Sequence, residues 1–87
     1  MALRKFVRYR NRKMHEVGSM AMHVGMDDLE AFVAKGDELE VIDDATGEDL
    51  TVAVLARILY NRCLKDSTAV EGKVLRDLIV DAHKRAA

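Results

Sequence analysis

The fold of this chain is decided by residues 41–51, which read Val41-Ile42-Asp43-Asp44-Ala45-Thr46-Gly47-Glu48-Asp49-Leu50-Thr51. The apolar residues at the start of this stretch predict a short strand over 39–42. The acids and small residues that follow are typical of a turn, in which Gly47 can supply a positive φ. Thr51 can cap the next helix by accepting an N–H bond, with Asp49 as a second acceptor there. The stretch therefore predicts a strand, a turn and a helix start in immediate succession.

Helical spacing of apolar residues predicts three helices, over 27–35, over 52–64 and after residue 68. The first begins with two acids, which suit the positive end of a helix dipole, and Gly36 follows it as a C′ residue. Either Thr68 or Ser67 can cap the third. The apolar faces of the second and third helices consist of Val54, Leu55, Ile58 and Leu59, and of Val70, Val74, Leu75, Leu78, Ile79 and Ala82.

The N-terminal third of the chain predicts an antiparallel hairpin. Residues 5–10 alternate partially between basic and other side chains, and residues 20–24 alternate again. Residues 17–19 have the composition of a turn between them. In such a hairpin His15 and His23 can face each other.

The expected fold is α+β: an N-terminal β-hairpin and a short further strand with three helices, in one small domain over 1–87. A domain of this size buries only about 60% of the surface of its unfolded chain, so self-association would help to stabilise it. Met residues suit irregular cores and adaptable interfaces equally well. Four of them therefore have two possible roles, in the core of the hairpin or on a dimer surface: Met14, Met20, Met22 and Met26.

Composition and motifs exclude several classes of protein. A single cysteine, Cys63, allows no internal disulfide, and no apolar stretch approaches the ~20 residues of a membrane helix. The charged N-terminus is not a secretory signal, so we expect a cytoplasmic, nucleoid-associated protein. Neither a zinc motif nor a phosphate-binding glycine loop occurs, and the acids of 43–49 lack the EF-hand pattern. We therefore expect no enzyme, no metal and no cofactor.

Charge is distributed very unevenly along the chain. Residues 1–15 carry six cations and no acid, whereas the remaining residues carry eight cations and fifteen acids. A +6 segment joined to a −7 body indicates a polyanion-binding arm, with a solvated charged face as the alternative. Six phosphate contacts would give a slope of about −5 in log K against log salt. The cations of the basic N-terminal segment, residues 4–13, are Arg4, Lys5, Arg8, Arg10, Arg12 and Lys13.

Several segments together resemble one known family. Arg8-Tyr9-Arg10-Asn11-Arg12-Lys13-Met14 is similar to the KYxNRRLYD opening of the DNA-binding domain of polyhydroxyalkanoate (PHB/PHA) accumulation regulators. Residues 24–29 resemble the VTLxDI segment of that family, and residues 74–79 its LLRQLIR helix. Residues 41–51 are very similar to its VxDAxTGEDLT run, the most specific of these matches. The segments occur in the family's order, from about residue 8 to residue 80.

The resemblance implies a bacterial transcriptional regulator, typically oligomeric, that binds double-stranded DNA and represses genes for storage-granule proteins. It also implies that the regulator can associate with the granule polymer. We expect Arg8, Arg10, Arg12 and Lys13 to contact phosphate, and Tyr9 and Asn11 to reach bases or sugars. With the two earlier cations, the candidate nucleic-acid-binding residues are Arg4, Lys5, Arg8, Tyr9, Arg10, Asn11, Arg12 and Lys13.

Two other functions remain open from the sequence. The acidic body and the Met cluster suit a protein-interaction module in a bacterial regulatory complex. The arginines also suit a sensor of an anionic ligand such as a nucleotide second messenger. The family's Tyr-Asp is replaced by His15-Glu16, and its Thr by Gly25, so the target of this chain can differ from the family's.

Overall fold

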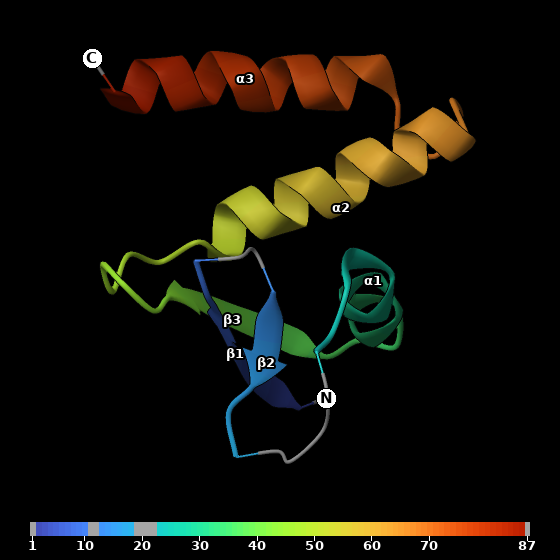
Figure 1. Ribbon diagram of the computed structural model, residues 1–87. Helices are drawn as coiled ribbons and strands as arrows, with labels where there is room; N and C mark the ends of the chain where they lie inside the picture. The colour runs from blue at the N-terminus through green and yellow to red at the C-terminus, as the bar shows by residue number, and fades with distance from the viewer. Residues whose placement is uncertain (1, 11–12, 19–22, 87) are drawn as a thin grey trace.

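The chain is described by a computed structural model that covers residues 2–10, 13–18 and 23–86. A three-stranded mixed sheet packs against two helices, and a third helix stands apart from it (Figure 1). This arrangement confirms the expected α+β class, with a hairpin, a further strand and three helices. The elements are β1 (Leu3–Arg8), β2 (Met14–Glu16), α1 (Met26–Ala34), β3 (Glu38–Asp43), α2 (Thr51–Lys65) and α3 (Gly72–Ala86).

The sheet has the strand order β2-β1-β3, with β1 antiparallel to β2 and parallel to β3. The predicted pairing of residues 5–10 with 20–24 is wrong, because the strand that returns along β1 is β2. The chain already reverses after β1, where the Tyr9 N–H donates to the Lys13 carbonyl at 2.9 Å. This earlier reversal places Met14 in the core, with 5% of its surface exposed. Residues 20–22 of the expected strand lie outside the described residues, and Val24 forms only an isolated bridge.

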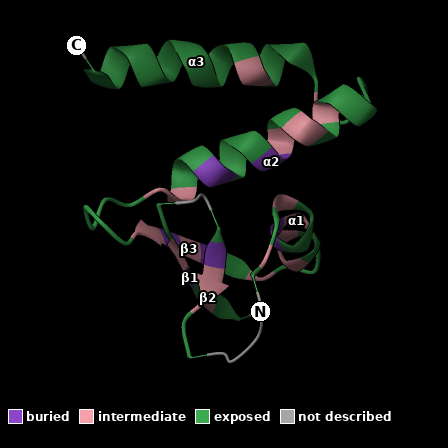
Figure 2. Ribbon diagram, in the orientation of Figure 1, coloured by how far each residue is buried: buried purple, intermediate pink, exposed green. Residues whose placement is uncertain are grey.

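The core lies between the sheet and the helices α1 and α2, which both contact β3 (Figure 2). Its fully buried members come from three different elements, and this links the hairpin strand β1 to α1 and β3. The buried residues are Phe6, Met14, Leu29, Leu39, Val41, Val54 and Ile58.

The alternation of β1 has an unexpected consequence for its basic residues. Because side chains of a strand alternate between faces, Arg4 and Arg8 lie on the same face as the buried Phe6. Lys5 and Val7 lie on the opposite face of the sheet. The basic face of β1 is therefore the face on which the helices pack, and its arginines meet groups supplied by other elements.

The loop from β3 to α2 follows the predicted order of strand, turn and helix. Gly47 has a φ of 73°, as the turn requires. Thr51 is the first helical residue rather than the N-cap, and the expected cap bond is made by Asp49, which accepts the Thr51 N–H at 2.9 Å. The Thr51 hydroxyl instead accepts the Val41 N–H at 2.9 Å. This difference arises because β3 is an edge strand of the sheet, and Val41 needs an acceptor outside it.

The other helix ends follow local signals to different degrees. Gly36 adopts a φ of 100° after α1, as predicted, and the Asp28 carboxylate accepts the Gly25 N–H at its start. The capping expected from Thr68 or Ser67 is wrong, because Thr68 donates both its N–H and its hydroxyl to Asp66 and α3 begins only at Gly72. None of the described helices combines the length and the apolarity that a membrane crossing requires.

Candidate nucleic-acid interface

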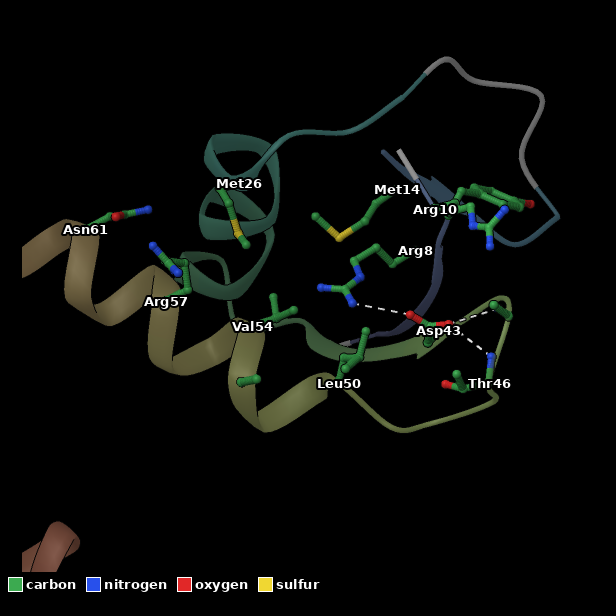
Figure 3. A pocket seen from close by; sticks show the side chains of 13 residues that line it. Arg8, Arg10, Met14, Met26, Asp43, Thr46, Leu50, Val54, Arg57 and Asn61 are labelled. Atoms are coloured by element: carbon green, nitrogen blue, oxygen red, sulfur yellow. Dashed lines mark hydrogen bonds and ion pairs between the residues drawn. The ribbon is translucent and has the colours of Figure 1, made fainter. Parts of the chain in front are cut away.

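A cavity of about 770 Å³ opens between the end of the β1–β2 hairpin, the loop after β3 and one side of α2 (Figure 3). Hereafter it is called the basic groove. Strand, loop and helix each supply part of its wall, so its shape depends on the packing of α2 against the sheet. It is lined by Arg8, Tyr9, Arg10, Met14, Met26, Asp43, Ala45, Thr46, Leu50, Ala53, Val54, Arg57 and Asn61.

The floor of the basic groove is apolar and its rim is cationic. Met14 and Val54 are each 5% exposed and belong to the core, so the floor is fixed by core packing. Arg8 and Arg10 stand on the hairpin side in Figure 3, and Arg57 stands on the α2 side. Cations from two separate elements thus stand on the two sides of one opening, where their fields add.

Arg8 is held by Asp43, the last residue of β3. Its Nη2 lies 3.3 Å from Oδ2 of Asp43, whose other oxygen accepts the N–H groups of Ala45 and Thr46. The N–H of Thr46 is the largest cause of a lowered pKa for Asp43, and Arg8 adds to it. Asp43 therefore stays ionised and neutralises part of the charge of Arg8, while it fixes the guanidinium on the rim.

Arg10 and Arg57 keep more of their charge available. Both are exposed, and in the described part of the chain neither has a carboxylate partner. Arg57 lies 5.8 Å from the ring centroid of Tyr60, a weak cation–π contact that leaves its N–H donors free for a ligand. The half-buried Asn61 stands one turn further along the same side of α2. This side of α2 thus presents an amide and a guanidinium to the groove.

Arg4 and Lys5 lie away from the basic groove. Arg4 forms ion pairs with Asp37 at 3.1 Å and with Glu16 at 3.5 Å, and its guanidinium stacks 3.9 Å from the ring centroid of Phe32. These contacts join β1, β2 and the end of α1, which is a structural role. Lys5 is exposed on the opposite face of the sheet.

The remaining candidate residues belong to the hairpin end. Tyr9 lines the groove and is 39% exposed. Lys13 is exposed where the chain re-enters β2. Asn11 and Arg12 lie outside the described residues. The structure therefore groups Arg8, Tyr9 and Arg10 at the groove, places Lys13 at the same end of the hairpin, and separates the two earlier cations from them.

His15 and His23 face each other as expected, although they do so beside the isolated Met14–Val24 bridge and not across the predicted hairpin. His23 Nδ1 lies 2.6 Å from His15 Nε2, a hydrogen bond that needs a proton on one nitrogen only. The His15 ring also meets Tyr9 edge-on at 5.1 Å. Desolvation, followed by Lys13 and His15, lowers the pKa of His23. The pair thus connects the hairpin to the segment before α1, and the lowered pKa favours the neutral form of His23.

Arg57 and Asn61 are the site residues that sequence reasoning missed. They lie three and seven residues after Val54, so helical spacing alone places them beside the buried face of α2. The sequence therefore shows a cation and an amide at the border of an apolar helix face. It does not show that they line a groove, because the opposite wall is the hairpin, whose position the sequence does not give.

Residues 6–66 match the model of the PHB/PHA accumulation regulator DNA-binding domain. The chain belongs to this family. The match extends from β1 to the end of α2 and includes every residue that lines the basic groove, and α3 lies beyond it. The match confirms the family resemblance of the segments within residues 6–66 and identifies a DNA-binding regulatory domain of polyhydroxyalkanoate storage, whereas the resemblance of residues 74–79 lies beyond it. No curated protein and no solved structure gives a match to the chain.

Proposed function

We propose that this PHB/PHA accumulation regulator domain acts as a repressor that binds duplex DNA with the basic groove and the adjoining hairpin end. The observation that carries the proposal is that Arg10 and Arg57 line one cavity from its two sides, without acid partners in the described residues. Guanidinium groups bind phosphate oxygens well, because their planar N–H donors match the geometry of phosphate.

The geometry suggests how the contacts divide. A two-stranded ribbon fits the major groove of DNA, so the hairpin end is the part that would approach base edges. Tyr9 and Asn11 lie in this segment and would reach bases or sugars. Arg57 on α2 would hold the phosphate backbone beside it, together with Arg10. Phosphate contacts fix the register of the protein without specifying sequence, so specificity would come from the hairpin.

Repression follows if the bound domain occupies DNA that transcription needs. In this account the protein works on the chromosome, in the nucleoid-associated part of the cytoplasm. A reporter gene behind a promoter fragment selected by the purified chain should be silenced by the native chain. Silencing should be lost when Arg10 and Arg57 are both replaced by alanine.

The apolar floor of the basic groove favours one second candidate, a sensor of an anionic ligand. A cavity of about 770 Å³ has room for a small phosphorylated molecule whose apolar part would cover Met14 and Val54. DNA phosphates would leave this apolar floor uncovered, whereas a small ligand of this kind would bury it. The two functions therefore differ in whether the floor is covered. Thermal stabilisation by small phosphorylated ligands, without affinity for duplex, would favour the sensor.

The direct test compares duplex affinities of Arg10→Ala and Arg57→Ala with that of a matched control, Arg76→Ala. Arg76 is an exposed arginine of α3 that lies 3.7 Å from Asp77, far from the groove in sequence and outside the family match. Each lost phosphate contact should weaken binding about eightfold at 0.1 M salt. Fluorescence anisotropy with labelled genomic duplexes measures this. If both groove variants bind as tightly as the Arg76 control, the proposed interface is wrong.

A further inference from the structure

His15 and His23, hereafter the histidine pair, are held opposite each other by the backbone. The segment before α1 runs antiparallel to β2, where Val24 bridges Met14 and donates its N–H to the Met14 carbonyl at 2.9 Å. In this register His23 stands directly opposite His15, and side chains in such cross-strand positions lie on one face of the sheet. The fold therefore brings together two imidazoles that are eight positions apart in the sequence.

The charged groups around the histidine pair are cations. In the described part of the chain, neither ring forms an ion pair with a carboxylate. Desolvation is the largest cause of the lowered pKa of His23, and the charges of Lys13 and His15 follow. On β1, Val7 stands opposite His15, and Lys5 is the next residue on the same face of the sheet. These surroundings favour neutral rings at pH 7.

The acids of the neighbouring segments are engaged elsewhere. Glu16 follows His15 in β2, but alternation turns it to the other face, where its carboxylate lies 3.5 Å from Arg4. At the start of α1, Asp28 accepts a backbone N–H at 2.9 Å, and Asp27 lines a hollow between α1 and α2. A proton on the histidine pair therefore meets cations of the chain, and an external anion is the partner it would gain.

The hydrogen bond between the two rings allows the histidine pair to take up one charge. His23 Nδ1 lies 2.6 Å from His15 Nε2, and one proton between these two nitrogens makes the bond. A first added proton occupies a ring nitrogen that faces away from the partner ring, so the bond is kept and charge strengthens it. A second would have to occupy a facing nitrogen and separate the rings. Acidification thus changes the pair from neutral to singly charged.

The histidine pair adjoins the surface that would meet DNA. The His15 ring meets Tyr9 edge-on, with 5.1 Å between the ring centroids, and Tyr9 lines the basic groove. His23 lies close enough to Lys13, at the hairpin end, for the Lys13 charge to act on it. A proton on the pair would therefore add a cation to those of the hairpin end, where the fields of the charges add.

We propose that the histidine pair makes duplex binding by this chain sensitive to acid, because the pair becomes a further cation beside the hairpin end and DNA phosphate favours that charged form. This inference rests on the proposed DNA function and adds its regulation. Proton and duplex would each strengthen the binding of the other by the same factor. The family's motif has tyrosine where His15 stands, and tyrosine loses its proton only near pH 10. The sensitivity to acid is thus a feature of this chain.

The test compares duplex affinity at pH 7.5 and pH 5.5 in 0.1 M salt, by fluorescence anisotropy with labelled genomic duplexes. The native chain should bind about eightfold more tightly at pH 5.5, and the slope of log K against log salt should be steeper by about 1, since one more cation faces phosphate. The double variant His15→Gln/His23→Gln should lose both effects. Both residues are replaced because either histidine alone still takes up a proton near pH 6.5.

His83→Gln is the matched control. His83 is an exposed histidine of α3, outside the family match, and its Nδ1 lies 3.0 Å from the Ile79 carbonyl oxygen. This variant should keep the eightfold gain at pH 5.5. Far-UV circular dichroism at both pH values checks that each chain compared is folded.

NMR of the imidazole rings in the native chain gives a second test that needs no variant. The pH at which the His15 and His23 signals titrate should rise by about 1 when duplex is added, which is the reciprocal of the eightfold gain in affinity. The His83 signals should titrate at the same pH with and without duplex, because α3 lies outside the proposed DNA interface.

The outcomes separate this inference from the proposed function. Duplex binding that is equally tight at both pH values overturns the inference alone, as does a double variant that keeps the eightfold gain. Titration of the histidine pair that duplex leaves unchanged, or a native chain that unfolds by pH 5.5, also overturns it. A native chain that binds no duplex at either pH refutes the proposed function, and this inference with it.

Discussion

The hydroxyl of Thr51 offers a sharp test of how the groove is built. It accepts the N–H of Val41 at 2.9 Å and so links the first turn of α2 to the edge strand β3. Val41 is fully buried, and this strand also pairs with β1, which supplies Arg8 to the groove. Replacing Thr51 by valine keeps the shape of the side chain and removes this acceptor, together with the hydroxyl's hydrogen bond to the exposed Asp49.

The expected cost comes from the donor that is left without a partner. A buried N–H that loses its acceptor destabilises a protein by about 1–3 kcal/mol. In a domain of this size each kcal/mol lowers the melting temperature by about 4–8 °C. Thr51→Ser keeps the hydroxyl and should lose much less stability than Thr51→Val, although it also lacks the methyl group.

Urea unfolding at one fixed protein concentration measures both variants, because self-association would otherwise add to the apparent stability. The reasoning is refuted if Thr51→Val unfolds within about 0.5 kcal/mol of the native chain, the range of an ordinary surface change. It is also refuted if Thr51→Ser is destabilised as strongly as Thr51→Val.

Two further predictions concern the cations and the histidines. Arg4→Ala should lower the free energy of unfolding by about 1 kcal/mol in urea, because Arg4 contacts Asp37 and Phe32. The same variant should leave the salt dependence of DNA binding unchanged, as measured by anisotropy. The lowered pKa of His23 means that the unfolded chain binds its proton more readily. Stability should therefore fall as the pH drops below about 6.5, and His23→Gln should weaken that fall in melting curves. A native chain with equal melting temperatures at pH 7.5 and 5.5 would contradict the histidine prediction.

Much of the fold was predictable because its signals are local. The turn at Gly47 and the end of α1 at Gly36 both require a positive φ, and the sequence places glycine at each. The helix α2 follows from apolar spacing alone. Such features depend on residues a few positions apart, which a sequence displays directly.

The hairpin partner could not be predicted in the same way. Residues 14–16 and 20–24 both offer a strand-like segment, and the turn composition of 17–19 favours the second. The choice depends on burial of Met14 against residues distant in sequence, which include Val54. Local composition does not contain that packing, so the register of β1 was assigned to the wrong partner.

The candidate site was predictable as a charged segment and not as a surface. A count of charges treats Arg4, Arg8 and Arg10 as equally good candidates for contact with DNA. The sheet brings Asp37 to Arg4 and Asp43 to Arg8, from more than thirty positions away, and these contacts separate the three arginines. The opposite wall of the groove comes from α2, whose cations the sequence places far from the basic segment. Both effects arise only when strand β3 pairs with β1 and helix α2 packs on β3.

The salt dependence of duplex binding tests the central claim most directly. The proposal counts four cations, namely Arg10, Lys13 and Arg57 with Arg12, which the sequence places between Arg10 and Lys13, and this predicts a slope of about −4 per copy in log K against log salt. Arg10→Ala and Arg57→Ala should each reduce the magnitude of that slope by about 1. A slope near zero for the native chain, or an unchanged slope in both variants, would contradict DNA binding through the basic groove.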